Sequence, residues 1–501
     1  MRGKSLMIQG TGSSVGKSVL CAALLRIMKQ DGMKVAPFKS QNMALNSFAT
    51  DEGLEMGRAQ VVQAEAAGVV PTVKMNPVLL KPTTDKRSQV ILNGKSIGNM
   101  SAVEYHKYKP QLRRMIKQVY DELESGYDCI VIEGAGSPAE INLRDGDIVN
   151  MATAELADAP VLLVGDINLG GVFASLYGTV MLLTESERAR IKGVIINKFR
   201  GDVKILEPGL RMLEDLIHIP VLGVIPYFDI DMEDEDSVTE RFSRSAGTGA
   251  LKIKIVRLPH ISNFTDFQLL ALEQDVSVEY ASKASDLRDA DIVILPGTKN
   301  TIEDLNWLKR TGLSDAVIRH ARADKFLIGV CGGYQMLGDK ICDPNGSESS
   351  IPEAAGLGLL SLSTTLSADK RTEQARGSVA CESGWLSDHN GLVLSGYEIH
   401  SGVSEIGADC EIFLRSPTGE PMGAMNHGHN VLGTYLHGLF DGGDFWRACV
   451  NKVRREKGID AVDGDIMSMA DFREREFDRL ADVVRQNLDM DKVMQIVRDE
   501  R

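Results

Sequence analysis

The run from residue 5 to residue 30 constrains the fold more than any other part of this sequence. A strand-like apolar run, SLMIQG, leads into GTGSSVGKS at residues 10–18, and the helical stretch GKSVLCAALLRIMKQ follows. Glycines let backbone N–H groups turn toward phosphate oxygens, and the helix N-terminus adds the positive end of its dipole. A strand, a glycine-rich loop and a helix in this order predict an α/β domain that binds a nucleotide.

Four residues of this loop have the chemistry that nucleotide binding needs. Gly12 and Gly16 supply close backbone approach, Lys17 can reach the β- and γ-phosphates, and the hydroxyl of Ser18 can ligate Mg²⁺. The gap from Gly10 to Gly16 is one residue longer than in the common GxxxxGK[ST] pattern, so the strict pattern fails while its physical requirements are met. A plain glycine turn before a helix is the alternative. We expect ATP and Mg²⁺ to bind here.

The alternation of strand-like and helical runs predicts the domain organisation. From residue 1 to 230 the strand-like runs are apolar on both faces, as strands of a covered parallel sheet are. Residues 231–250 are acidic and then rich in Ser and Gly, which is typical of a linker. Strand-like runs resume over 251–445, and residues 446–501 are expected to form a helical C-terminal extension. The predicted fold class is α/β, with two doubly wound domains.

Charge and cysteine content exclude several classes of protein. The net charge of −14 and the pI of about 5.3 argue against a nucleic-acid partner, which requires a basic face. No apolar run approaches the ~20 residues of a membrane helix, and no signal-peptide pattern is seen. Seven cysteines form no CxxC pair, which fits reduced thiols. We therefore expect a cytoplasmic protein without a nucleic-acid or membrane partner. Its oligomeric state is left open.

A second chemical motif occupies FLIGVCGGYQMLG at residues 326–338. It predicts a strand, a sharp turn at Cys331 and a helix, which together expose a nucleophile at the turn. The helix N-terminus favours the thiolate, and the N–H of Gly332 is a candidate oxyanion donor. The PGTKN segment could supply a second donor near Gly297 or Thr298.

The general base that such a thiol needs is expected to be His437. Among nine histidines, His437 in VLGTYLHGLF directly follows a strand-like run, whereas others lie in polar loops or helix-like segments. GVCGGYQMLG and GTYLHGLF together resemble the class I glutamine amidotransferases, which implies that ammonia is released from glutamine at Cys331. Standard members continue His-Pro-Glu, but this chain reads His437-Gly438-Leu439. What orients His437 is therefore open, and Glu398 in GYEIHSG is one candidate.

The first domain resembles dethiobiotin synthetase and its relatives. Besides the GTxxxVGK[ST] loop, the matching pieces are PFK at 37–39 and EGAGS at 133–137, each at the carboxyl end of a strand-like run. The resemblance implies that Glu133 is the acidic Mg²⁺ partner of Ser18 and that Lys39 stabilises phosphate or substrate charge. It also implies that Asn197 contacts adenine. A helix-capping role for Glu133 and a turn role for Asn197 are the alternatives.

Three further segments resemble the cobyric acid synthase family: PFKSQNMALNS (37–47), EMGRAQVVQAEAAG (55–68) and MNPVLLKPTTDKRSQVILNG (75–94). The family amidates carboxylates b, d, e and g of adenosylcobyrinic acid a,c-diamide, with glutamine as nitrogen donor and one ATP for each amide. The resemblance thus implies these three small molecules as substrates. Basic side chains near these segments are candidates for binding the substrate carboxylates: Arg58, Lys81, Lys86 and Arg87.

Three other functions compete with this interpretation. The sibling cobyrinic acid a,c-diamide synthase has the same two domains, but the PFKSQNMALNS segment favours cobyric acid synthase. A partition-type P-loop ATPase has no use for the Cys331 turn. A glutaminase subunit leaves the phosphate-binding loop without a role.

Overall fold

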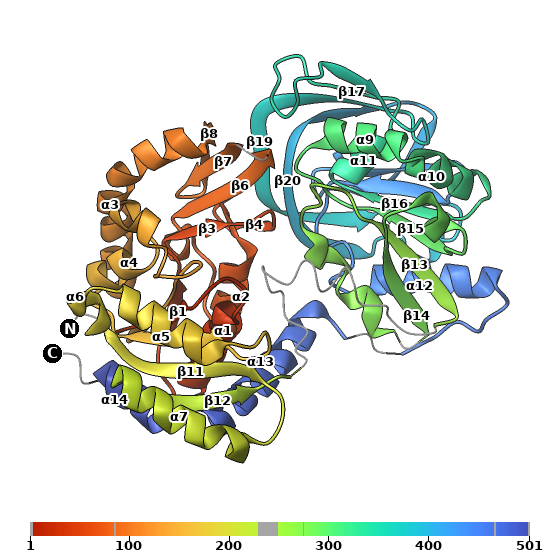
Figure 1. Ribbon diagram of the computed structural model, residues 1–501. Coiled ribbons are helices and arrows are strands. Elements are labelled where there is room, and N and C mark those ends of the chain that lie inside the picture. The colour runs from red at the N-terminus through yellow and green to blue at the C-terminus, as the bar shows by residue number, and fades with distance from the viewer. Residues whose placement is uncertain (1–3, 85–86, 229–248, 274, 465–466, 499–501) are drawn as a thin grey trace. The chain divides into compact units, whose positions relative to one another are not determined.

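The computed structural model describes residues 4–84, 87–228, 249–273, 275–464 and 467–498 (Figure 1). The expected linker at 231–250 lies, except for its last two residues, outside the described residues. No helix among the described residues is both long and apolar enough to cross a bilayer.

Two compact units share the chain in an interleaved way. Unit 1 comprises Met1–Ala44, Glu55–Ser237 and Arg473–Arg501, and unit 2 comprises Leu45–Leu54 and Val238–Phe472. A ten-residue segment from the N-terminal half therefore belongs to unit 2, and the end of the chain returns to unit 1. The simpler domain boundaries expected from the sequence, 1–230 and 251–445 with an extension at 446–501, stay predictions.

Unit 1 is built on a six-stranded sheet in which all neighbours are parallel, in the order β12-β11-β10-β1-β9-β2. Its central strands are buried apolar runs, as predicted for a sheet covered on both faces. The strands are β1 (Lys4–Gly10), β2 (Val35–Phe38), β9 (Cys129–Glu133), β10 (Val161–Asp166), β11 (Ile191–Phe199) and β12 (Val221–Pro226). The expected α/β fold is confirmed for this half.

Helices cover this sheet, and a small second sheet extends unit 1. The helices are α1 (Lys17–Gln30), α2 (Arg58–Ala67), α3 (Ala102–Glu124), α4 (Met151–Leu156), α5 (Val172–Leu182), α6 (Glu185–Arg188), α7 (Val203–Ile217), α13 (Met469–Asn487) and α14 (Met490–Arg498), with 3-10 turns η1 (Val73–Met75) and η2 (Ile141–Gly146). The second sheet has the order β3 (Gln41–Met43), β6 (Val78–Thr84), β7 (Arg87–Leu92) and β8 (Lys95–Ser101). A capping box between Ser101 and Glu104 starts α3.

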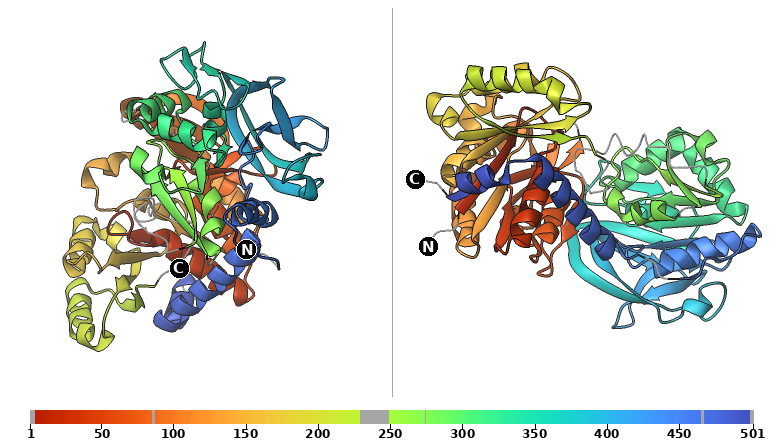
Figure 2. Two further views of the ribbon diagram at one scale, coloured as in Figure 1. Left: turned by 90° about the vertical axis from the view of Figure 1, so that its right-hand side faces the viewer. Right: turned by 90° about the horizontal axis from the view of Figure 1, so that it is seen from below.

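The C-terminal helices complete the core of unit 1. Figures 1 and 2 show α13 and α14, in blue, lying against the red and yellow elements of this unit. Phe477, Val484 and Val497 are buried in the same apolar cluster as β1 and α1. Arg26 of α1 pairs with Glu474 and Asp478 of α13. Both kinds of contact fix the end of the chain to the beginning.

Unit 2 contains a larger, mixed sheet. Its parallel part has the order β14-β13-β15-β16-β23, which the sequence predicted in outline. These strands are β13 (Leu251–Val256), β14 (Val276–Ala281), β15 (Ile292–Leu295), β16 (Phe326–Val330) and β23 (Val431–Thr434). The helices of the unit are α9 (Thr301–Arg310), α10 (Leu313–Arg322), α11 (Gly332–Leu337) and α12 (Asp444–Glu456), and the 3-10 turns are η4 (Phe264–Phe267), η5 (Leu269–Leu272), η6 (Ala284–Leu287) and η7 (Ser387–His389). Apolar clusters fill both faces of the sheet.

An extension that no sequence pattern predicted continues this sheet, and its strand pairs are antiparallel except for the parallel pair of β17 and β19. Its two long strands, β19 (Leu362–Val379) and β20 (Val393–Ile406), curve through Figure 1 as broad ribbons. The shorter strands are β17 (Lys340–Cys342), β18 (Glu353–Ala355), β21 (Cys410–Arg415) and β22 (Pro421–Asn426). The segment Leu45–Leu54, which includes β4 (Ser47–Ala49), packs on β19 and β20.

Candidate active sites

The phosphate-binding loop joins β1 to α1, and its backbone is tightly constrained. Gly16 has φ of 96°, and a Cβ atom there would lie 2.2 Å from Asn197 Nδ2, so only glycine fits. Helix α1 begins at Lys17 without a side-chain cap. The positive end of its dipole suits an anion such as a phosphate.

Two side chains predicted for this site hold the loop itself. Lys17, which is almost fully buried, donates through Nζ to the carbonyl of Gly12 (2.8 Å). Asn197 on β11 donates through Nδ2 to the carbonyl of Val15 (2.9 Å). The structure therefore brings Gly12, Lys17 and Asn197 together at the carboxyl ends of β1 and β11, where ligands of open α/β sheets bind.

Glu133, the last residue of β9, is the centre of a buried polar cluster. Its Oε1 atom accepts hydrogen bonds from Ser18 Oγ (2.8 Å) and Lys39 Nζ (3.0 Å), and its Oε2 atom accepts one from Gln63 Nε2 (2.6 Å). Burial opposes ionisation, but the charge of Lys39 and these hydrogen bonds hold the pKa of the Glu133 carboxyl below its usual value. Glu133 is thus a carboxylate at neutral pH, and a simple helix-capping role is wrong.

The contact between Ser18 and Glu133 fits a magnesium site. A hydroxyl and a carboxylate are hard oxygen donors, and Mg²⁺ typically takes one or two carboxylates together with substrate phosphates. Within the described ranges, no cluster of three or more His, Cys, Asp or Glu side chains could form a metal cage. The donor set therefore suits a metal ion that arrives with a nucleotide.

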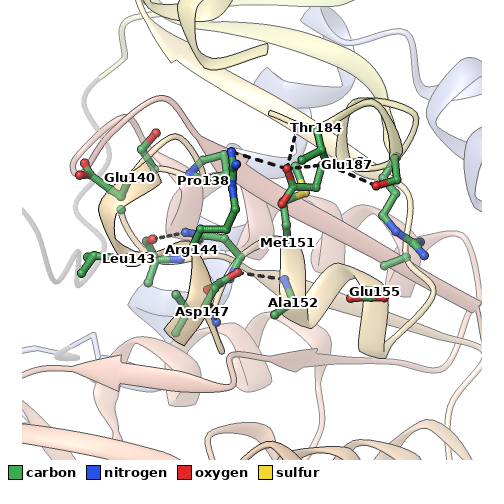
Figure 3. A pocket seen from close by; sticks show the side chains of 18 of the residues that line it. Pro138, Glu140, Leu143, Arg144, Asp147, Met151, Ala152, Glu155, Thr184 and Glu187 are labelled. Atoms are coloured by element: carbon green, nitrogen blue, oxygen red, sulfur yellow. Dashed lines mark hydrogen bonds and ion pairs between the residues drawn. The ribbon is translucent and has the colours of Figure 1, made fainter. Parts of the chain in front are cut away.

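A cavity of about 1090 Å³ opens beside the loop that follows Glu133 (Figure 3). Residues 135–138, η2 and α4 line it, and Arg144 and Glu187 point toward each other across it (3.8 Å). Basic side chains from α3 and from β11 also line it: Lys109, Arg113 and Lys192. Burial lowers the pKa of Lys109. The cavity can hold a substrate much larger than a small carboxylic acid.

The candidate nucleophile Cys331 lies at the turn between β16 and α11. Its backbone has φ of 51° and ψ of −110°, an unfavourable conformation for any residue with a Cβ atom. The turn is held because Cys331 N–H donates to Thr434 O (2.8 Å) and because Gly333 packs against β15, where a Cβ atom would lie 2.0 Å from Leu295 O. The expected strained elbow is therefore present.

Two backbone N–H groups lie together beside this thiol. A Cβ atom on Gly332 would lie 3.2 Å from the backbone nitrogen of Thr298, so the two peptide units are neighbours. Gly297, on the same segment, approaches the ring of His437: its Cβ position lies 3.3 Å from Cε1. An oxyanion site with one donor at Gly332 and a second near Gly297 or Thr298 stays a prediction, and Gly297 and Thr298 both lie on the segment that approaches this turn.

The orienting partner of His437 is Asp266, which the sequence analysis missed. Asp266 Oδ2 lies 2.7 Å from His437 Nδ1, and its Oδ1 accepts the N–H of Gly438 (3.3 Å). Burial disfavours the imidazolium, but the charge and hydrogen bond of Asp266, with a smaller contribution from Cys331, raise the pKa of His437 to about 10. Cys331, His437 and Asp266 form a catalytic-triad arrangement.

Glu398 does not take this place. It pairs with Arg371 (Nε to Oε2, 3.0 Å) and lies 3.5 Å from His400 Nε2. Asp266 is 171 residues before His437 and follows no strand, so no strand-end pattern marked it. The available signal was a carboxylate between two aromatic residues, Phe264 and Phe267, in a segment that is buried.

The candidates for binding substrate carboxylates are spread over different environments. Lys81 is buried in an ion pair with Glu55 (2.9 Å), and Arg58 is buried at the start of α2. Arg87 is exposed and donates to Asn99 O. Lys86 lies outside the described residues. None of the three described residues lines the cavity of Figure 3.

Comparison with known families matches each unit to a domain type. Residues 6–237 match the CobQ/CobB/MinD/ParA nucleotide binding domain, and residues 252–445 match the CobB/CobQ-like glutamine amidotransferase domain. The phosphate-binding loop and Glu133 fall in the first match, and the Cys331 triad falls in the second. Nucleotide binding is therefore a property of the first domain's family.

Similar proteins span the whole chain. A cobyric acid synthase of Thermoanaerobacter sp. (strain X514) is 53% identical, covering 98% of both chains. Another, from Photorhabdus laumondii, is 51% identical and covers 100% of this chain and 99% of its own. A third, from Streptococcus sanguinis, is 51% identical over 99% of both. The chain therefore belongs to the cobyric acid synthase family of glutamine-hydrolysing carbon–nitrogen ligases.

Proposed function

We propose that this enzyme amidates carboxylates b, d, e and g of adenosylcobyrinic acid a,c-diamide, with ammonia released from glutamine and one ATP spent on each amide. One observation carries the proposal: a single chain holds both a Cys331–His437–Asp266 triad and a phosphate loop next to a buried Lys39–Glu133 pair. A glutaminase alone needs only the first, and a partition ATPase only the second.

In the glutaminase half, the Cys331 thiolate attacks the carboxamide carbon of glutamine. His437 holds Nδ1 against Asp266, so Nε2 is the nitrogen that faces the reaction and gives a proton to the departing ammonia. The N–H groups of Gly332 and Thr298 stabilise the oxyanion. Water then hydrolyses the thioester, which gives glutamate and frees the thiol.

In the synthetase half, a substrate carboxylate oxygen attacks the γ-phosphorus of ATP, and ADP leaves. Lys17 and Lys39 stabilise the charge on the transferred group, and the N–H groups at the start of α1 bind the phosphates. Bound Mg²⁺, held by Ser18 and Glu133, would neutralise phosphate charge. Ammonia then attacks the acyl carbon and phosphate leaves. Asn197 would meet adenine while still holding the loop.

The cavity of Figure 3 is our proposed place for the corrin substrate. Its volume suits a large ring, and Lys109, Arg113 and Lys192 suit peripheral carboxylates. Gln41 and Met43 also line it, and both belong to the PFKSQNMALNS segment that favours this family over the sibling enzyme. Arg58, Lys81 and Arg87 are weaker candidates, because none lines the cavity.

Mass spectrometry of adenosylcobyrinic acid a,c-diamide, incubated with enzyme, Mg-ATP and glutamine, tests the proposal. Four successive carboxyl-to-amide conversions are expected. Turnover of cobyrinic acid instead would transfer the assignment to cobyrinic acid a,c-diamide synthase, the alternative. A cytoplasmic location and the expected lack of nucleic-acid and membrane partners stay predictions from the sequence.

A further inference from the structure

Residues 45–54 come from the N-terminal half of the sequence but belong to unit 2. Within that unit, Phe48 packs on Tyr397 (ring centroids 5.0 Å apart), and Tyr397 stacks on His437 (5.2 Å, interplanar angle 16°). Ala49 is fully buried in the same cluster with Tyr397 and Ile399. A side chain of this segment is thus one ring away from the proposed catalytic base.

The same segment also contacts the turn that carries Asp266. Ser47 N–H donates to Asn263 Oδ1 (3.2 Å), and Asn263 Nδ2 donates to the hydroxyl of Tyr397 (3.3 Å). Asn263 is the N-cap residue directly before η4, and its carbonyl accepts the N–H of Asp266 (3.1 Å). Both neighbours of His437, the stacked ring and the carboxylate, are therefore braced by residues 45–54.

The two sequence flanks of this segment lead to the other site. Lys39 precedes it by six positions and binds Glu133 Oε1. Gln60 and Gln63 follow it and bind Glu133 Oε2 (3.4 and 2.6 Å). The chain thus leaves the Glu133 cluster, contacts the surroundings of the triad and comes back to the same carboxylate.

We propose that residues 45–54 are a positioning segment for the glutaminase triad, acting through Phe48 and Asn263. The proposal rests on the proposed function for the identity of this triad. Phe48 and Asn263 touch neither glutamine nor the reacting atoms, so they are positioning residues. A small misplacement of a catalytic group can cost about 100-fold in rate, so loss of the contacts of residues 45–54 with Tyr397 and Asn263 should be measurable.

The first test compares Phe48→Ala with Phe48→Tyr in glutamine hydrolysis without any other substrate. We expect Phe48→Ala to lower kcat about 10-fold or more and to leave KM within about two-fold, since alignment rather than binding is lost. Phe48→Tyr, which keeps the aromatic ring, should have a kcat close to that of wild type. The control is Val403→Ala. Val403 lies on β20, the strand that carries Tyr397, and it is 70% exposed. Equal kcat in Phe48→Ala and wild type would overturn the proposal.

A second variant removes the hydrogen bonds of this segment without changing the aromatic stack. Asn263 has φ of 50°, which glycine tolerates, so Asn263→Gly keeps the turn but removes both amide hydrogen bonds. It should lower kcat in the same way as Phe48→Ala. If Phe48→Ala does not fold, this variant decides the question alone, and unchanged kcat would refute the positioning role.

Ammonia-dependent amidation of the corrin is the separate arm for the proposed function: its absence in wild type would refute that function and leave the glutamine-only comparison valid.

Discussion

Replacement of Asp266 by Asn removes one charge from the glutaminase site and hardly changes its shape. The carboxylate faces two donors, the Nδ1–H of His437 at 2.7 Å and the N–H of Gly438 at 3.3 Å. An asparagine has one acceptor oxygen and one NH₂ group. It can therefore accept from only one of these donors, and its NH₂ group faces the other donor. In either orientation the imidazolium loses its counter-charge.

The size of the effect follows from the pKa of His437, which Asp266 raises to about 10 in spite of burial. A neighbouring opposite charge shifts a pKa by about 1–3 units. In Asp266→Asn, the alkaline limb of the pH–rate profile for glutamine hydrolysis should therefore move to a lower pH by that amount. Combined with lost alignment, kcat should fall roughly 100- to 1000-fold, or ~3–4 kcal/mol in the barrier. Ammonia-dependent amidation should be unaffected.

The assay is steady-state glutamate release between pH 6 and pH 10, with Glu398→Gln as the matched control. Glu398 is also a buried carboxylate near a histidine, but it does not bind His437. We expect a much smaller loss of kcat for this control. A larger loss in Glu398→Gln than in Asp266→Asn, or an alkaline limb that does not move in Asp266→Asn, would refute the assignment of the triad acid.

The same pair makes stability depend on pH. The pKa of His437 in the folded state is above its unfolded value of about 6.5, so protonation stabilises the fold most below pH 6.5. This contribution is lost as the pH rises through about 10. The difference in unfolding free energy between wild type and Asp266→Asn should shrink over that window.

Four other variants have expected outcomes. Cys331→Ser should lose glutamine-dependent amidation and keep the ammonia-dependent reaction; glutamine use by this variant would contradict the two-site scheme. Gly16→Ala should lower thermal stability, because its Cβ atom would lie 2.2 Å from Asn197, whereas Gly12→Ala should fold normally and weaken only Mg-ATP binding measured by calorimetry. Glu133→Gln should abolish amidation in both assays. Because the folded pKa of Glu133 is lowered, its ionic contribution to stability is present above about pH 4.5 and is lost as the pH falls through the folded value, so urea midpoints of wild type and variant should converge in acid.

Sequence patterns predicted the parts of this fold that depend on local order along the chain. Runs of buried apolar residues marked β1, β9 and β10, and glycines beside Lys17 and Cys331 marked the two turns that carry chemistry. Each of these signals lies within about fifteen residues, so periodicity and turn chemistry suffice to find it.

Features that depend on distant pairing could not be found in this way. Strands β19 and β20 are rich in polar and charged residues, because one face is exposed, and they form through pairing with each other. Asp266 meets His437 only after the parallel sheet has formed, since 171 residues separate them. The assignment of residues 45–54 to unit 2 likewise has no local signal.

The return of the chain to unit 1 has a consequence for protein synthesis. Leu480, Val484 and Val493 belong to the same core as β1 and α1, yet the ribosome makes them only after the whole of residues 251–445. At about 5–20 residues per second, an interval of roughly 12–50 s separates the end of β12 from the first residues of this final segment. During that interval the nucleotide-binding half exposes the apolar surface that α13 and α14 will cover, so premature termination near residue 470 should leave a nascent product that chaperones bind and proteases remove.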